Sequence, residues 1–223
     1  MKKIKEWYIK HKLLVNIVIG AVVLVALTLG ITIQLASKKY YHKYTSFEIY
    51  TETNKLVYDS IKLALMHEVD NYITKVAPTS SLDGIVIIDN CIIYDIDICF
   101  VLSQAEQESH FGTQGLARKT NSVFNVFAFD GHNYSQINMN GKYSHPNDCV
   151  QPYLALLKRD YLVNGKTEYD MLTNYVNKGG KRYASSETYE QALQKNFSRI
   201  KSTTKIDSLS RELHKYRLLL GMN

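Results

Sequence analysis

The feature that most constrains this chain is an uncharged, apolar stretch near its N-terminus, residues 13–36. Its 24 residues are enough to span a bilayer as a helix. Flanking lysines and aromatic residues are typical of membrane helices, and here they are Lys2, Lys3, Lys5, Trp7, Tyr8, Lys10 and Lys12 before it and Lys38, Lys39, Tyr40, Tyr41 and Lys43 after it. A cleaved signal peptide is the alternative, but its apolar core usually has only roughly 7 to 15 residues. The pattern favours an uncleaved membrane anchor.

The larger number of lysines before the apolar stretch predicts a cytoplasmic N-terminus, with the rest of the chain outside the membrane. The chain then divides into a basic segment 1–12, a transmembrane helix 13–36, a stalk 37–78 with an amphipathic helix, a folded domain 79–204 and an amphipathic basic helix 205–223. Whether that last helix packs on the domain or extends from it stays open.

The charge balance limits the partners of this protein. Lys and Arg number 27 against 21 Asp and Glu, which gives a formal net charge of +6 and a pI of about 9.0. This balance favours an anionic partner, and DNA, anionic lipid and anionic cell-wall polymer all qualify. The positive charges are spread along the chain and no groove-reading motif appears, so we predict no nucleic-acid partner.

Apolar residues recur at three- and four-residue steps through most of the chain, which predicts a mainly helical fold. Asp97 is the expected N-cap of a helix over 98–109, and Asp148 has the features of an N-cap for the helix that follows it. Residues 82–94 are rich enough in isoleucine and valine for a buried strand, yet they also share a helical face. Further helices are expected over 54–76, 146–163, 167–176 and 188–201.

Cysteine and histidine spacings predict no metal or other cofactor. The odd number of cysteines allows one disulfide and one thiol in an exported domain, but buried reduced side chains are favoured for Cys91, Cys99 and Cys149. The domain contains three candidate histidine ligands, but no two of them have the spacing of metal ligands: His110, His132 and His145.

The most informative segment, residues 101–131, reads VLSQAEQESHFGTQGLARKTNSVFNVFAFDG. It resembles the glucosaminidase family of peptidoglycan hydrolases, within the lysozyme-like superfamily. The matching positions are Gln104, Glu108, Ser109, Gly112, Leu116, Ala117, Asn121, Phe124 and Asn125. A second block, residues 174–200, is similar to the family's Tyr-x-x-x-Gly-x-x-Tyr-Ala segment and its following helix. The resemblance covers about residues 82–200, implies a lysozyme-like helical domain with a small β or irregular lobe, and favours a helix over 82–94.

Glu108 is the predicted catalytic acid. Cleavage of a glycosidic bond needs a carboxylic acid that keeps its proton near neutral pH, which requires burial against apolar or aromatic groups. Glu108 follows an apolar helix and precedes His110 and Phe111. Burial and the C-terminal end of the helix dipole would both raise the pKa of its carboxyl. The neighbouring Glu106 lacks the surrounding motif and fits a solvated surface position better.

The sequence offers few candidates for a second catalytic carboxylate, because residues 121–152 contain no Glu and only two Asp. Asp130 lies at an expected turn on the cleft side and is the candidate for a second catalytic carboxylate. The alternative is a mechanism with one acid. In that case the N-acetyl group or the 6-hydroxyl of the substrate attacks the anomeric carbon.

The resemblance also implies roles for several other residues. Tyr175 stands where related lysozyme-like enzymes have a tyrosine whose hydroxyl contacts the acid, and Tyr183 is expected in the sugar groove. Ser109 and Asn121 are expected to fix the turn beyond the acid through backbone hydrogen bonds, and Ser109 is not read as a nucleophile. The full set of residues expected around the substrate is Gln104, Ser109, Asn121, Phe124, Asn125 and Tyr183.

Taken together, the sequence predicts a membrane-anchored hydrolase that cleaves a β-1,4 bond of peptidoglycan glycan strands, of the N-acetylglucosaminidase type. Lytic transglycosylase and muramidase chemistry stay open as variants of this reading. The alternative of another class is a catalytically silent wall-binding or virion structural protein that keeps the fold. Positive charge would favour retention of the hydrolase on an anionic wall.

Overall fold

The computed structural model describes residues 46–126, 133–137 and 139–222, together with residues 16, 21, 24, 25 and 27–32. The chain divides into two compact units, Met1–Asn54 and Lys55–Asn223. The core and the candidate site both belong to the second unit.

Most of the expected membrane segment, residues 13–36, lies outside the described residues. Within the described part of the chain, no helix combines the length and the apolar character that crossing a bilayer requires. The membrane anchor therefore stays a prediction.

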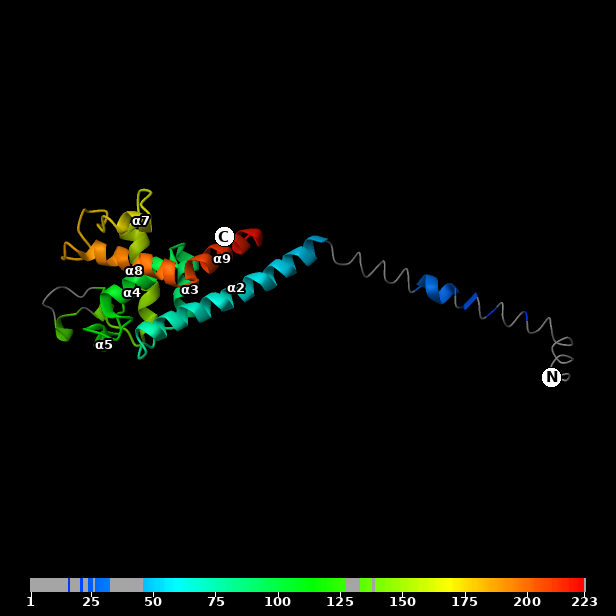
Figure 1. Ribbon diagram of the computed structural model, residues 1–223, viewed down its shortest axis with the longest axis horizontal. Helices are drawn as coiled ribbons and strands as arrows, with labels where there is room; N and C mark the ends of the chain where they lie inside the picture. The colour runs from blue at the N-terminus through cyan, green and yellow to red at the C-terminus, as the bar shows by residue number, and fades with distance from the viewer. Residues whose placement is uncertain are drawn as a thin grey trace. The chain divides into compact units, whose positions relative to one another are not determined.

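Helix α2 (Ser46–Val76) leads into the second unit (Figure 1). Its buried face contains Leu65, Val69 and Ile73, which are at most 3% exposed. Their four-residue spacing is the amphipathic pattern that the sequence shows. Pro78 follows, and proline disfavours a helical conformation in the residue before it, so the helix ends at Val76. From Lys55 onward this helix belongs to the compact unit rather than to a separate stalk.

Helices α3 (Gly84–Tyr94) and α4 (Ile98–Ser109) come next, so the segment that could have been a strand is helical. The predicted N-cap of α4 is confirmed, because the Asp97 carboxylate accepts hydrogen bonds from the N–H groups of Cys99 and Phe100. Helix α4 is buried from its first residue through Ala105, which makes it the central helix of the domain.

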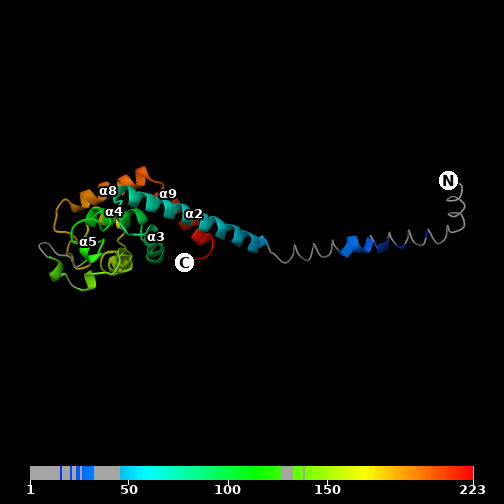
Figure 2. The ribbon, with the colours of Figure 1, turned by 90° about the horizontal axis from the view of Figure 1, so that it is seen from below.

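Helix α8 (Tyr189–Thr203) packs along α4 (Figure 1, Figure 2). Its buried side chains follow the three- and four-residue steps of an amphipathic helix, at Tyr189, Leu193, Phe197 and Ile200. Because Tyr189 is the first member of this stripe, the packing of α8 brings it toward the C-terminal end of α4.

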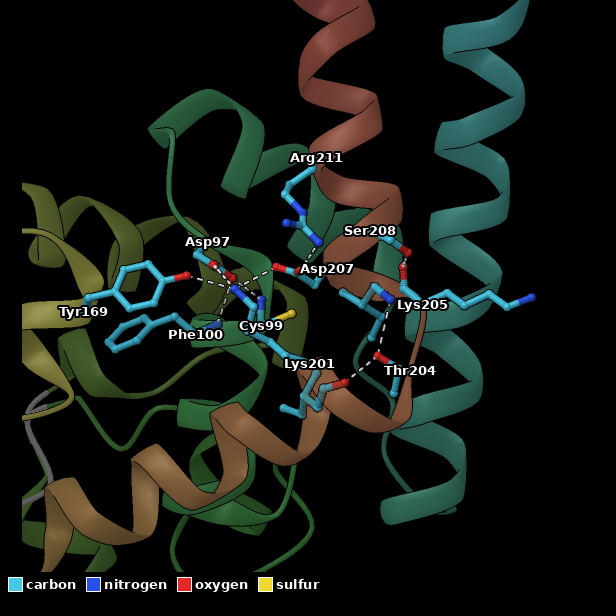
Figure 3. A network of polar contacts seen from close by, with 12 residues as sticks. Asp97, Cys99, Phe100, Tyr169, Lys201, Thr204, Lys205, Asp207, Ser208 and Arg211 are labelled. Carbon is cyan, nitrogen blue, oxygen red and sulfur yellow. Dashed lines mark hydrogen bonds and ion pairs between the residues drawn. The ribbon is translucent and has the colours of Figure 1, made fainter.

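A charged cluster fastens helix α9 (Ile206–Leu219) to the domain, as Figure 3 shows. The Nζ atom of Lys201 lies 2.7 Å from a carboxylate oxygen of Asp207 and 3.7 Å from one of Asp97. The same atom donates a hydrogen bond of 2.8 Å to the Tyr169 hydroxyl. Ile206 and Leu213 of α9 are buried as well. The C-terminal helix thus packs on the domain, which decides the alternative that the sequence left open.

The described residues of the expected lobe form short helical turns, namely α5 (Ala117–Thr120), η1 (Tyr134–Gln136) and η2 (Met139–Gly141). Between residues 46 and 222, with 127–132 and 138 set aside, β structure is limited to one isolated bridge between Val176 and Arg182. The prediction of a mainly helical fold is confirmed.

The chain then continues through η3 (Pro146–Cys149), α6 (Val150–Leu156), the π-helical turn η4 (Leu157–Tyr161) and α7 (Glu168–Met171). The predicted role of Asp148 is wrong, because His145 is the N-cap of this helical run. Asp148 instead occupies the third position and accepts a hydrogen bond of 3.0 Å from the His145 N–H. Pro146 explains the shift, since proline has no N–H and suits the first position of a helix.

The three cysteines are buried in the core and are not joined in disulfides. Cys149 is tied to its surroundings, with its Sγ accepting from the Val123 N–H at 3.3 Å and donating to the Pro146 carbonyl at 3.0 Å. Burial raises the pKa of its thiol to about 12, so the group stays neutral. The cysteines therefore serve as small core side chains.

Candidate active site

An abrupt turn at the end of α4 positions Glu108. Residues 110–112 have φ values of 52°, 57° and 83°, in the left-handed region that ends an α-helix. The Ser109 hydroxyl holds this turn by accepting a hydrogen bond of 2.8 Å from the Gly112 N–H and donating one of 2.6 Å to the Val123 carbonyl. Glu108, in the last helical turn, therefore projects from a fixed backbone.

The Glu108 carboxyl is surrounded by neutral hydrogen-bond donors. The Tyr189 hydroxyl donates to its Oε1 atom in a short contact. The Gln104 side-chain amide lies 3.4 Å from the same oxygen, and the Asn125 amide lies 3.4 Å from Oε2. Asn125 also donates to the backbone carbonyl of Glu108 at 2.6 Å, which locks the two residues together.

The environment of Glu108 favours its protonated form. Burial raises the pKa of its carboxyl from 4.5 to about 6, because the charged form loses hydration. Hydrogen bonds from Tyr189, Asn125 and Gln104 act in the opposite direction and lower the pKa, since donors stabilise the carboxylate. Burial prevails, so the acid titrates in the range that glycosidic bond cleavage requires.

Gln104, Tyr189 and Glu108 are connected by consecutive hydrogen bonds. The Gln104 amide donates to the Tyr189 hydroxyl at 2.6 Å, and that hydroxyl in turn donates to Glu108. Gln104 is fully buried, and its side-chain carbonyl has no hydrogen-bond partner among the described residues. Gln104 is expected from the sequence to contact the substrate, but it does not line the cleft and instead lies behind Glu108.

The tyrosine contact predicted for Tyr175 is made by Tyr189. Tyr175 is fully buried, and its hydroxyl lies 3.4 Å from that of Tyr153, deeper in the core. Its ring stacks on Tyr183 at a centroid distance of 4.5 Å. Tyr183 lines the cleft, and its hydroxyl donates to the Phe124 carbonyl at 2.8 Å.

Three other predicted residues support the site from inside the fold. Phe124 is fully buried and stacks on Tyr153 at 3.8 Å, so its ring does not face the cleft. Ser109 is 3% exposed and holds the turn after α4. Asn121 has a left-handed backbone and donates to the carbonyls of Tyr143 and Ser144, at 2.9 and 3.1 Å. The expected backbone hydrogen bonds of Ser109 and Asn121 are confirmed, whereas no contact of these residues with the cleft is found in the described structure.

Glu108 opens into a cleft of about 690 Å³. The walls combine aromatic rings, small side chains and two cations, and the lining residues are Glu108, Asn125, Val126, Leu156, Tyr161, Asn177, Lys181, Arg182, Tyr183, Ala184, Ser185, Ser186 and Tyr189. Tyrosines suit carbohydrate, because the ring packs on the apolar face of a sugar while the hydroxyl stays hydrogen-bonded. Polar groups at fixed positions among apolar walls are typical of a ligand site.

Glu108 is the only carboxylic acid among the described residues that line this cleft. Asp130, the candidate second carboxylate, lies outside the described residues, as does His132. His110 contacts the Val76 carbonyl through Nε2 at 2.8 Å, and His145 caps η3. The described residues contain no group of three or more His, Cys, Asp or Glu that could hold a metal ion.

The neighbouring Glu106 has a different environment, on the other side of α4. Its carboxylate accepts a hydrogen bond of 2.5 Å from the Tyr72 hydroxyl and forms an ion pair with Arg199 of α8. Glu106 was expected to be solvated, but its side chain is only 13% exposed. It joins α2, α4 and α8 and does not line the cleft.

A helical domain that presents one carboxyl of raised pKa to a tyrosine-lined cleft has the features of a glycoside hydrolase. The glucosaminidase family model, described as mannosyl-glycoprotein endo-β-N-acetylglucosaminidase, matches residues 86–202. Because this match covers more than half of the chain, the protein belongs to the glucosaminidase family and is a glycoside hydrolase of the endo-β-N-acetylglucosaminidase type. A search of curated proteins finds no match.

Proposed function

We propose that this protein is a peptidoglycan β-N-acetylglucosaminidase in which Glu108 is the general acid. The observation that carries the proposal is the position of Glu108, a carboxyl with a pKa of about 6 that opens into the cleft. Family membership supports the bond type, because the matched family model is described as an endo-β-N-acetylglucosaminidase. The basic net charge of +6 favours an anionic cell-wall polymer as the substrate.

In the proposed reaction, protonated Glu108 gives its proton to the glycosidic oxygen as the bond between that oxygen and the anomeric carbon breaks. Negative charge then appears on the Glu108 carboxylate. The donors of Tyr189, Gln104 and Asn125 stabilise that charge more strongly than they stabilise the neutral acid. They therefore stabilise the transition state more than the ground state, and this difference is what accelerates the reaction.

The positive charge on the sugar ring also needs a partner. Since Glu108 is the only acid among the described lining residues, we propose a one-acid mechanism. The substrate's own N-acetyl group or 6-hydroxyl then attacks the anomeric carbon. Attack by the N-acetyl oxygen leads to hydrolysis after water adds, and the Glu108 carboxylate takes up a proton of that water. Attack by the 6-hydroxyl gives a 1,6-anhydro sugar, and the hydroxyl proton passes to the Glu108 carboxylate.

The test of the proposed activity is mass spectrometry of the fragments that the purified protein releases from cell-wall sacculi. We expect fragments whose reducing end is N-acetylglucosamine. Reducing muramic acid would indicate a muramidase and contradict the proposed bond. Ends with a 1,6-anhydro sugar would assign the attack to the 6-hydroxyl, which is the transglycosylase variant of the one-acid mechanism. A folded preparation that binds sacculi but releases no fragments would contradict the proposal and favour a silent wall-binding protein.

We also propose that residues 13–36 anchor the enzyme in a membrane, with the N-terminus cytoplasmic and the catalytic domain outside. The support is the uncharged apolar run and the excess of lysines before it. A protease added outside intact cells or spheroplasts should digest the chain after Lys38 and leave the first 12 residues protected. The reverse protection pattern would contradict this orientation.

A further inference from the structure

A rigid hairpin presents two cations to the cleft beside Glu108. The hairpin comprises residues 176–182 and is closed by the bridge between Val176 and Arg182. Inside it, the Asn177 side-chain oxygen accepts hydrogen bonds from the N–H groups of Gly179 and Lys181, at 2.9 and 3.0 Å. The Asn177 N–H donates to the Lys181 carbonyl at 2.8 Å. These bonds fix the backbone from which the side chains at 181 and 182 project.

The hairpin is also tied to the body of the domain. Lys178 donates to the Asp160 carbonyl through its backbone N–H at 2.7 Å, and its Nζ lies 2.9 Å from the Asp160 carboxylate. At the other end, the Tyr183 N–H donates to the Tyr175 carbonyl at 2.8 Å. Tyr175 is fully buried, so both ends of the hairpin are anchored.

The side chains of Lys181 and Arg182 line the cleft. Through Nη2, Arg182 forms an ion pair with Glu190 and donates to the Ser186 carbonyl at 3.0 Å, which orients the guanidinium. A guanidinium carries further N–H groups on Nε and Nη1, so it can bind a second acceptor in a fixed direction.

The charge of the cleft separates two kinds of glycan. In the protonation state that the proposed reaction needs, Glu108 is uncharged. The charged side chains among the described residues that line this cleft are then Lys181 and Arg182, and Arg182 is paired with Glu190. A mannosyl glycan or a chitin oligomer is neutral and offers no charge to these cations. Muramic acid carries a carboxyl on its lactyl group, and a peptide attached there carries carboxylates of its own.

We propose that Lys181 and Arg182 form a subsite that binds the carboxylate borne by the lactyl or stem-peptide substituent of a muramic acid residue. The subsite deepens the proposed function and rests on it. It gives this enzyme a preference for peptidoglycan over neutral glycans that contain the same N-acetylglucosamine linkage. Binding of the carboxylate next to the reactive sugar also places the glycosidic oxygen against Glu108.

The test is equilibrium binding by calorimetry with the full-length Glu108→Gln chain, which leaves the ligand intact. Three ligands are compared: a chitin oligosaccharide, peptide-free peptidoglycan strands and strands that keep their stem peptides. Adding Lys181→Gln should weaken binding of the anionic strands by roughly two- to fivefold, as expected for one exposed charge. Binding of the chitin oligosaccharide should not change. Lys195→Gln, an exposed lysine of α8 outside the cleft, is the matched control and should change neither.

The ligands whose binding weakens identify the group that the subsite binds. Weaker binding of peptide-free strands assigns the subsite to the lactyl carboxylate, and weaker binding of peptide-bearing strands alone assigns it to the stem. An equal loss for the neutral oligosaccharide, or no loss in both Lys181→Gln and Arg182→Gln, would overturn the proposal. If the unsubstituted enzyme cleaves none of the three ligands, the proposed function fails, while the binding comparison still reports on the subsite.

Discussion

Two glutamates on helix α4, only two positions apart, show how surroundings decide what a carboxyl does. Both accept a hydrogen bond from a tyrosine hydroxyl, and both have a partner on α8. The partner of Glu106 is the guanidinium of Arg199, whereas the partner of Glu108 is the phenol of Tyr189. With a charged partner, Glu106 serves to hold α4 against α2 and α8. Neutral partners and burial leave Glu108 able to hold and release a proton near pH 6.

The largest expected effect is on the rate of wall lysis, and it should distinguish a substitution at Glu108 from the same substitution at Glu106. Glu108→Gln should lower the rate of wall lysis by about 10² to 10⁴ or more, because the general acid is lost while the shape is kept. Glu106→Gln should leave the rate within a fewfold of the unsubstituted enzyme. It should instead lower the free energy of unfolding by about 1 to 3 kcal/mol, since it removes the charge that pairs with Arg199 and one of the two acceptor oxygens that serve Tyr72 and Arg199.

Rates of dye release from labelled sacculi, together with urea denaturation of both variants, check this pair. Retained lysis in Glu108→Gln would contradict the assignment of the acid. A collapsed fold in that variant would instead make Glu108 a structural residue. Equal loss of activity in both variants would contradict the assignment of a catalytic role to Glu108 and a structural role to Glu106.

The next effect distinguishes Tyr175, which the sequence predicts to contact the acid, from Tyr189, which contacts Glu108 in the structure. Tyr189→Phe should reduce turnover on the order of 10²-fold, because it removes a donor that stabilises the developing carboxylate. Tyr175→Phe should reduce it less than about tenfold, since that hydroxyl contacts Tyr153 in the core. Steady-state kinetics of both variants make the comparison. A larger loss in Tyr175→Phe would restore the assignment that the sequence favoured.

A smaller effect is expected at Asp130, which distinguishes one-acid from two-acid chemistry. With substrate assistance, Asp130→Asn should reduce turnover by less than about tenfold, and clearly less than Tyr189→Phe does. If Asp130 is a nucleophile, base or counter-charge, the loss should instead reach orders of magnitude. Turnover numbers of the two variants, measured on the same strands, decide between these mechanisms. A nearly inactive Asp130→Asn beside a nearly normal Tyr189→Phe would overturn the one-acid proposal.

Local signals in the sequence predicted the helices and the partly buried position of Glu108 at the end of α4, because these depend on neighbouring residues. The N-cap at Asp97 and the helix over 98–109 agree with α4 at both ends. The identity of the tyrosine beside Glu108 depends on how α8 docks against α4, and no local pattern fixes that. The usable signal was the apolar stripe of α8, whose first member is Tyr189. The apolar stripe indicates Tyr189 as the tyrosine beside the acid, whereas the family-like motif indicates Tyr175.

The last expected effect is on stability rather than on turnover, and it is the dependence of stability on pH that Glu108 causes. The folded-state pKa of about 6 exceeds the ordinary value of 4.5, so the folded chain binds the proton more tightly than the unfolded chain does. This contribution is fully present below about pH 4.5 and is lost as the pH rises through about 6. The loss amounts to about 2 kcal/mol. Glu108→Gln lacks it, so its stability relative to the unsubstituted enzyme should improve by that amount between about pH 4.5 and 7.5.

Urea denaturation of both chains across this pH range measures the difference directly. The Tyr189 hydrogen bond lowers the pKa of Glu108, so Tyr189→Phe should raise the folded-state pKa and enlarge the loss of stability with rising pH. A difference between Glu108→Gln and the unsubstituted enzyme that stays constant with pH would show that Glu108 titrates alike in both states. In that case burial would not explain its ability to act as an acid, and the contrast with Glu106 would rest on geometry alone.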